Sequence, residues 1–363
     1  MNSKPRIAFV IDALPALGGG EKVLFTALEV FPHAELFTLV YNKKLFDNTP
    51  LACHSVNTSF LDRLPFARKY HRLFLPAMPF AIEQFDLRGF DAIVSFSYAV
   101  AHGVISGDGA RHISYTYTPM RYAWQELNIN GLHTRQNLLI VRYMQAFRAW
   151  DRTAASRVHQ FAAISQAVSR RIAHTYHRTA EVIYPPVEVS RFRPALEREN
   201  FYITVTRLMP HKRIDLLVRA FAQLDLPLVV VGEGPERRHL IQLAGPNIRF
   251  LGYQPDDKVV ELLAKARGFV CATEEDFGIA MVEAQAAGCP VIAYRQGGAL
   301  ETVVDGKTGI FFSEQTIESL VDALQRFERA HSSFHVPELV ENAGKFDRKN
   351  FLIQFRDFVC KTI

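Results

Sequence analysis

The sequence predicts an α/β protein made of two doubly wound parallel sheets in tandem. Short apolar runs alternate with amphipathic stretches in both halves, which is the pattern of βαβ units. The length of 363 residues suits two domains, and 48% hydrophobic residues suffice for two full cores. A polar, proline-containing stretch over residues 184–198 separates the halves, as an interdomain linker does.

The first half opens as strand, helix and strand. Ile7–Ile11 is a predicted strand, a loop with three glycines follows, and a helix over 21–31 leads to a strand over 35–40. The same pattern predicts strands at 92–96, 112–117 and 160–164. We place the first domain at residues 1–185.

The alternation restarts after the linker, and we place the second domain at residues 199–344. Strands are predicted at 201–206, 227–232, 248–251, 268–272 and 291–294. Helices are predicted at 214–223, 237–243, 256–266 and 277–287, the last ended by Gly288 and Pro290. Apolar residues recur at helical spacing over 348–359, and we group this C-terminal helix, 345–363, with the first domain.

Positive charge is concentrated in the first half. Residues 1–200 hold 23 lysines and arginines against 16 acidic residues, whereas residues 201–363 hold 19 against 21. This excess favours an anionic partner, such as a membrane lipid or a phosphorylated substrate, or else it is a solvated basic surface. Because no nucleic-acid-binding motif accompanies it, we expect no nucleic-acid partner.

The cysteines and the apolar runs predict a cytoplasmic protein. Cys53, Cys271, Cys289 and Cys360 are scattered without a CxxC motif, so we interpret them as reduced core thiols. The sequence shows no pattern of a secretory signal and no apolar run long enough to span a membrane.

The stretch around Gly278 carries the most specific signal. A strand ends, an acidic loop follows and Gly278 opens a helix, so the N–H groups of Gly278, Ile279 and Ala280 suit a phosphate. Glu275 precedes this helix and Glu283 lies about two turns into it, where two carboxylates can grip a nucleotide sugar at both ends. The alternative is a pair of capping acids and a surface glutamate.

Two other loops follow predicted strands, at the position where ligands bind in such sheets. Arg207 and Lys212 offer fixed positive charge for a diphosphate leaving group, or they belong to a solvated basic loop. The turn at Gly232 is followed by Glu-Gly-Pro and is not GxGxxG, so it indicates a tight turn or a loop facing a ligand.

Together these motifs resemble the retaining, GT-B-fold glycosyltransferases of family 4. The resemblance covers Arg207 with Lys212, the turn at 232–235, Glu275 with Glu283, and residues 297–309. The segment YTYTPMRYAW at 115–124 is similar to bacterial mannosyltransferases of surface polysaccharide assembly. The resemblance implies two Rossmann-like domains facing a central cleft, with a C-terminal helix that in this family often crosses back to the first domain.

The resemblance also implies a role for each site residue. Glu283 binds the donor ribose, Glu275 contacts the transferred sugar, and the two cations hold the diphosphate. Ser165 matches a recurrent serine of less clear role. The implied donor-binding residues are Gly19, Gly20, Arg207, Lys212, Gly232, Gly278, Ile279, Ala280 and Glu283; the catalytic ones are Glu275, Arg207, Lys212 and Tyr117; the acceptor-binding ones are Arg121, Tyr122 and Trp124.

Tyr117 departs from the family, in which many relatives carry a histidine at this position. Tyrosine keeps a hydrogen-bonding hydroxyl but supplies no imidazole that titrates near neutral pH. This difference leaves open a second hypothesis, a non-catalytic scaffold that binds nucleotide sugars. The chain has no Asp-x-Asp motif, and fixed cations can replace a divalent ion, so we expect metal-independent transfer without a cofactor.

Residues 60–76 interleave basic, aromatic and apolar side chains. This composition suits a membrane interface and a lipid-diphosphate-linked saccharide acceptor, or else an amphipathic helix packed on the sheet. We therefore expect an enzyme at the inner face of the cell membrane, active in polysaccharide or lipopolysaccharide biosynthesis. Its expected donor is GDP-mannose, with another GDP-deoxysugar or a UDP-sugar as alternatives, and the fold alone also permits a sugar-nucleotide epimerase.

Overall fold

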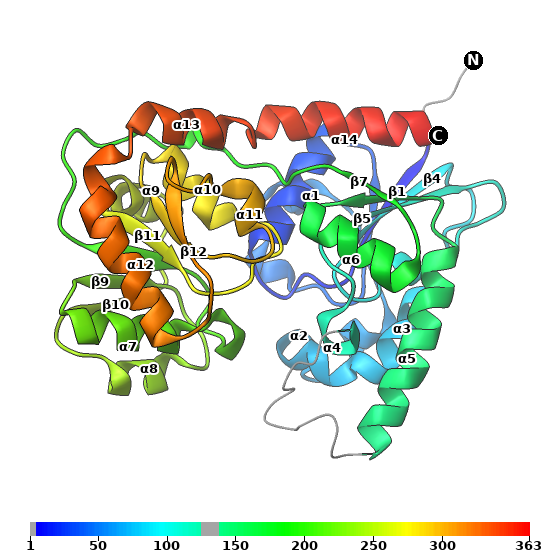
Figure 1. Cartoon of the computed structure of the whole chain (residues 1–363). Helices are drawn as coiled ribbons and strands as arrows, with labels where there is room; N and C mark the ends of the chain where they lie inside the picture. The colour runs from blue at the N-terminus through cyan, green and yellow to red at the C-terminus, as the bar shows by residue number, and fades with distance from the viewer. Residues whose placement is uncertain (1–4, 125–137) are drawn as a thin grey trace. The chain divides into compact units, whose positions relative to one another are not determined.

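The computed structural model describes residues 5–124 and 138–363 and divides the chain into two compact units. The first unit consists of Met1–Tyr184 together with Phe351–Ile363, and the second consists of Pro185–Asn350. Each unit is a parallel sheet with helices around it; in Figure 1 the first is coloured blue to green with its C-terminal helix in red, and the second green to orange. The predicted class, two tandem doubly wound α/β domains, is confirmed.

The sheet of the first unit has seven parallel strands in the order β3-β2-β1-β4-β5-β6-β7. The edge strands β3 and β7 were not predicted, because three residues are too few to show a pattern. The strands are β1 (Ile7–Ile11), β2 (Glu35–Thr38), β3 (Val56–Thr58), β4 (Ala92–Ser97), β5 (Arg111–Thr116), β6 (Gln160–Ala163) and β7 (Ala180–Val182). The helices are α1 (Gly19–Val30), α2 (Ala67–Tyr70), α3 (Met78–Glu83), α4 (Arg121–Trp124), α5 (Leu138–Ser156) and α6 (Gln166–Tyr176).

The sheet of the second unit has six parallel strands in the order β10-β9-β8-β11-β12-β13. These strands are β8 (Tyr202–Val205), β9 (Leu228–Val231), β10 (Ile248–Gly252), β11 (Gly268–Cys271), β12 (Val291–Tyr294) and β13 (Gly309–Phe312). The helices are α7 (Ile214–Leu224), α8 (Arg237–Leu243), α9 (Asp256–Lys265), α10 (Ile279–Ala286), α11 (Ala299–Thr302), α12 (Ile317–Ala330) and α13 (Val336–Gly344). The last helix, α14 (Arg348–Thr362), begins here and belongs to the first unit from Phe351 on.

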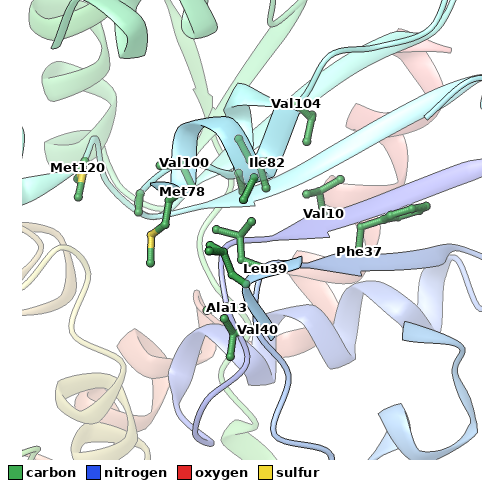
Figure 2. Packing of buried hydrophobic residues seen from close by; sticks show 14 of the residues in the cluster. Val10, Ala13, Phe37, Leu39, Val40, Met78, Ile82, Val100, Val104 and Met120 are labelled. Carbon is green, nitrogen blue, oxygen red and sulfur yellow. The ribbon is translucent and has the colours of Figure 1, made fainter. Parts of the chain in front are cut away.

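Apolar side chains fill both faces of the first sheet. On one face Val10, Phe37, Leu39, Ile82 and Val100 belong to a cluster of buried residues, shown in Figure 2. Fully burying a side chain of this size stabilises a fold by about 1.5–3 kcal/mol. Neighbouring residues on a strand point to opposite faces, so the strand residues next to these line the other face.

That other face is covered by the C-terminal helix α14. The Phe355 ring lies 6.4 Å from Phe9, 6.0 Å from Phe96 and 6.0 Å from Tyr115, measured between ring centroids. Phe351 stacks on Phe355 at 5.1 Å. The chain's last residues are thus part of the first unit's core.

Several predicted details are corrected by the structure. Helix α1 begins at Gly19 rather than residue 21, and α10 begins at Ile279 rather than 277. Cys271 and Cys289 are buried thiols as predicted, whereas Cys53 and Cys360 are exposed. Among the described residues, no helix is long and apolar enough to cross a bilayer.

The strand order reverses between β1 and β4 in the first sheet and between β8 and β11 in the second. Loops that leave the carboxyl ends of such neighbouring strands diverge, and ligands bind in the crevice at this switch point. In the second sheet, Arg207 and Lys212 follow β8 and Glu275 follows β11. The predicted cations and carboxylate therefore flank the switch point.

Candidate active site

In the second unit, four loops at the carboxyl edge of the sheet are bonded to one another. Leu208 N–H donates to the Glu233 carbonyl at 2.9 Å, joining the loops after β8 and β9. The Thr273 hydroxyl donates to the His211 carbonyl at 2.8 Å, joining the loops after β11 and β8. Gly298 N–H donates to the Glu275 carbonyl at 2.8 Å, joining the loops after β12 and β11. These hydrogen bonds hold the four loops in place relative to one another, and we call this edge of the sheet the platform.

The centre of this platform is an ion pair between two residues that the sequence analysis singled out. Lys212 Nζ lies 2.6 Å from Glu275 Oε1, and the two side chains are only 20% and 24% exposed. The pair joins the end of a 3₁₀ helix, Pro210–Lys212, to the loop before α10. Positive and negative charge are thus fixed side by side, where a diphosphate and a sugar hydroxyl can each find a partner.

Helix α10 points its N-terminus into the same region. Gly278 is its N-cap, with φ of 94°, a conformation that L side chains rarely adopt. A Cβ there would meet the Met281 side chain at 2.0 Å. The helix therefore starts one residue later than Gly278, and the N–H groups of Ile279 and Ala280 stand in its first turn. The positive end of the helix dipole favours an anion at this place.

Glu283 lies half-buried on α10. It acts electrostatically on Arg191, a residue close to the beginning of the second unit. Burial lowers the pKa of the Arg191 guanidinium, but Asp256, Asp257 and Glu283 together raise this pKa by more. Behind the helix, the buried Gln285 amide donates to the Thr302 carbonyl at 2.8 Å. A network of this kind fixes the rotation of α10 and with it the position of Glu283.

Arg207 and Gly232, the two remaining residues predicted for this site, differ in how closely the surrounding chain packs on them. Arg207 is exposed, and within the described residues its guanidinium has no hydrogen-bond or salt-bridge partner. Gly232 has φ of 131°, and a Cβ there would lie 1.9 Å from the Thr206 carbonyl oxygen. Gly232 thus permits the close approach of two loops.

In the first unit, the sequence analysis missed Asp12, which follows β1 directly. Its buried carboxylate accepts the backbone N–H groups of residues 98–101 at 2.5–3.1 Å, across the switch point. Burial raises the pKa of Asp12 more than the hydrogen bonds from Tyr98, Val100 and Ala101 and the nearby His102 lower it. Asp12 could have been found in the sequence as an acidic residue directly after a predicted apolar strand.

Tyr117 and the glycine loop are brought together. The Tyr117 hydroxyl donates to the Gly20 carbonyl at 2.8 Å, and Gly19 and Gly20 form the first turn of α1. Burial raises the pKa of Tyr117 well above its usual value, so this phenol is neutral at any physiological pH. The residue that departs from the family therefore holds the glycine loop.

Of the predicted acceptor residues, Arg121 and Trp124 lie on the short helix α4, and the side chain of Tyr122 lies outside the described part. The Trp124 indole N–H donates to Asp151 Oδ2 at 2.6 Å, so the ring is anchored to the core. Ser165 is the N-cap of α6, and its hydroxyl accepts the Val168 N–H at 3.1 Å.

Within residues 5–124 and 138–363, no three His, Cys, Asp or Glu side chains are grouped to hold a metal ion. The second unit instead offers a fixed ammonium, a helix N-terminus and two carboxylates on its switch-point edge. This combination can bind a diphosphate-bearing ligand and stabilise negative charge that develops on it.

Two Rossmann-like units in tandem are the architecture of the GT-B fold. Residues 187–348 match the family model of glycosyl transferases group 1. The family resemblance seen in the sequence is thereby confirmed.

Two of the similar curated proteins align with less than half of the chain. The GDP-mannose-dependent alpha-(1-6)-phosphatidylinositol monomannoside mannosyltransferase of Mycolicibacterium smegmatis is 32% identical, over 48% of this chain and 55% of its own length. The N-acetyl-alpha-D-glucosaminyl L-malate synthase of Bacillus anthracis is 32% identical, over 44% of this chain and 42% of its own length. The chain thus spans about half the length of the curated relatives it matches.

The likeness to solved structures extends over both units. The crystal structure of Anabaena HepE in complex with UDP covers 98% of this chain and 100% of its own, with a TM-score of 0.73. Its sequence is 17% identical, so this likeness establishes the fold.

Proposed function

We propose that the protein is a retaining glycosyltransferase that binds a nucleotide-sugar donor on the second unit. The observation that carries the proposal is the Lys212–Glu275 pair, placed at the switch point beside the N-terminus of α10. Both residues lie within the part of the chain that matches the glycosyl transferases group 1 family. A scaffold would not require a charged pair at this position.

In the proposed mechanism, the chain chiefly stabilises the departing diphosphate. The Lys212 ammonium and the first turn of α10 neutralise the negative charge that grows as the sugar–phosphate bond breaks, and Arg207 adds a mobile cation. Glu275 orients the transferred sugar, and Glu283 holds the donor ribose. In this account Tyr117 acts by positioning Gly20 rather than by exchanging a proton.

GDP-mannose is the donor that we propose. The support is the family match together with the M. smegmatis relative, which is named as GDP-mannose-dependent. A UDP-sugar is the second candidate, because HepE was crystallised with UDP.

The proposal is tested by following label from GDP-mannose into a lipid extract of the source cells. We expect labelled lipid product with GDP-mannose and an unchanged rate in excess EDTA, because fixed cations neutralise the diphosphate here. Loss of transfer in EDTA with recovery in Mg²⁺ would overturn metal independence. Conversion of the donor into a different sugar nucleotide in the absence of an acceptor would favour an epimerase.

The proposed acceptor is a lipid-linked saccharide, and the first unit has a surface suited to meet it. Residues 60–80 form short helical turns rather than one packed helix. Phe66 is 75% exposed, Leu73 71% and Phe80 61%, although each is a large apolar side chain. The exposed cations of this segment are Arg63, Arg68, Lys69 and Arg72, of which Arg68 is paired with Asp62. We propose that this surface docks on anionic membrane lipid.

Vesicle flotation tests this membrane surface. Wild-type protein should float with vesicles of phosphatidylglycerol, and the double variant Phe66→Ser, Leu73→Ser should bind them at least about tenfold more weakly, since each side chain loses its apolar burial. Tyr253→Ser, at an equally exposed site in the second unit, is the control. Equal flotation of the double variant and the wild type would contradict the proposal.

A further inference from the structure

Two arginines of α5 share one tryptophan ring in the first unit. The guanidinium carbon of Arg152 lies 4.8 Å from the centroid of the Trp124 ring, and that of Arg148 lies 5.7 Å from it. These arginines are four residues apart, on one face of the helix, where like charges repel. Cation–π contact offsets part of this repulsion.

The ring that carries the two cations is fixed from the core side. Asp151 Oδ2 accepts both the Trp124 indole N–H at 2.6 Å and the Tyr176 hydroxyl at 2.9 Å. His102 Nε2 lies 2.9 Å from Asp151 Oδ1, in an electrostatic contact without hydrogen-bond alignment. Ser97 Oγ in turn is 2.9 Å from His102 Nδ1. Asp151 is fully buried, so the indole cannot turn freely.

Within the described residues, each guanidinium donates one hydrogen bond, through its Nε. Arg148 Nε donates to the Ala123 carbonyl at 2.5 Å, and Arg152 Nε donates to the Thr175 carbonyl at 3.3 Å. Neither side chain forms an ion pair with an acidic residue in the described part of the chain, and both residues are exposed. Both exposed residues thus have terminal N–H groups without an acidic partner in that part of the chain, and planar forks of this kind suit the oxygens of a phosphate.

We infer that Arg148 and Arg152, held on Trp124, form a subsite for a phosphate group. The inference rests on the proposed function, in which the first unit receives the acceptor, and it specifies that the acceptor is a phosphate ester or diphosphate. A phosphate bridging the two guanidinium groups relieves their mutual repulsion. It also explains why Trp124 is locked by a buried carboxylate instead of being exposed for stacking on a sugar.

Intrinsic fluorescence tests this subsite directly, because the chain has two tryptophans, Trp124 and Trp150. In a Trp150→Phe, Lys212→Ala background, Trp124 is the one emitter and pyrophosphate binding to Lys212 is removed. Sodium pyrophosphate, at constant ionic strength, should change its emission in a saturable way. Arg148→Gln with Arg152→Gln should weaken this binding at least about tenfold, since each charge-assisted pair contributes roughly that much. Arg170→Gln, an exposed arginine on α6, should leave it unchanged.

Phosphatidylglycerol vesicles in a second titration separate the two sources of phosphate. A response to pyrophosphate identifies a phosphoryl group of a substrate, whereas a response to vesicles alone identifies a lipid headgroup, and both support the subsite. If Trp150→Phe does not fold, the Trp124 indole N–H resonance in otherwise unchanged protein gives the same readout. No response to either probe, or equal binding by the double variant, would overturn the inference. The test needs no transfer activity, so its failure is distinct from failure of the proposed function.

Discussion

Replacing Lys212 with alanine should lower the turnover number by about two to three orders of magnitude while the protein stays folded. The reason is that its ammonium lies beside Glu275, in the loop before α10. No other lysine of the described chain forms a salt bridge to Glu275 and could replace it. Glu275→Gln keeps the side-chain shape and removes the charge, and its turnover should fall by a similar factor. Transfer rates at saturating donor, with circular dichroism as the folding check, measure both.

Lys258→Ala is the matched control for these variants. Lys258 also forms a 2.7 Å ion pair, with Glu261, but on an exposed face of α9, so its loss should leave turnover unchanged. The double variant Lys212→Ala, Glu275→Gln should lose less than the product of the two single losses, because the residues act as a pair. Near-wild-type turnover in both single variants would exclude the proposed mechanism.

Asp151→Ala should lower the free energy of unfolding of the first unit by about 3–5 kcal/mol, as expected when one partner of a buried charged cluster is removed. The alanine leaves the Trp124 indole N–H and the Tyr176 hydroxyl without their acceptor, and it leaves the His102 ring beside a cavity. Unsatisfied buried donors of this kind are costly.

Urea unfolding followed by tryptophan fluorescence measures this loss in one unit alone, because both tryptophans lie in the first unit. Asp86→Ala is the control, since Asp86 pairs with Arg88 at the surface and its removal should change the stability by less than about 0.5 kcal/mol. A loss of less than about 1 kcal/mol for Asp151→Ala would show that the cluster does not anchor the fold.

The sequence predicts much of the alternation of strands and helices. Periodicity places Arg237–Leu243 and Val291–Tyr294 at their observed bounds, whereas β13, α12 and α13 lie between residues 295 and 347, where no element was predicted. The edge strands Val56–Thr58 and Ala180–Val182 are not predicted, because three partly exposed residues are too few to show the apolar–polar pattern of a strand. The start of α10 is displaced because the left-handed conformation of Gly278 is a backbone property that spacing does not reveal.

The candidate site is predictable in part for the same reason. Lys212, Gly278 and Glu283 are found by their position after strands, since topology then brings the loops to one edge. Asp12 and Asp151 are not found, because their hydrogen-bond partners are 25–89 residues away in the chain. The contact of His102 with Asp151 is likewise visible only in the three-dimensional structure.

The most direct test of the central claim is thermal stabilisation by nucleotides. GDP, GDP-mannose, UDP and UDP-glucose are compared on wild type, on Glu283→Ala and on the exposed control Glu341→Ala. A ligand at 100 times its Kd stabilises the folded state by about 2.7 kcal/mol, which is readily seen as a rise in Tm. We expect a rise with the guanine nucleotides that is lost in Glu283→Ala and kept in Glu341→Ala. No rise with any nucleotide would contradict the claim that the second unit binds a nucleotide-sugar donor.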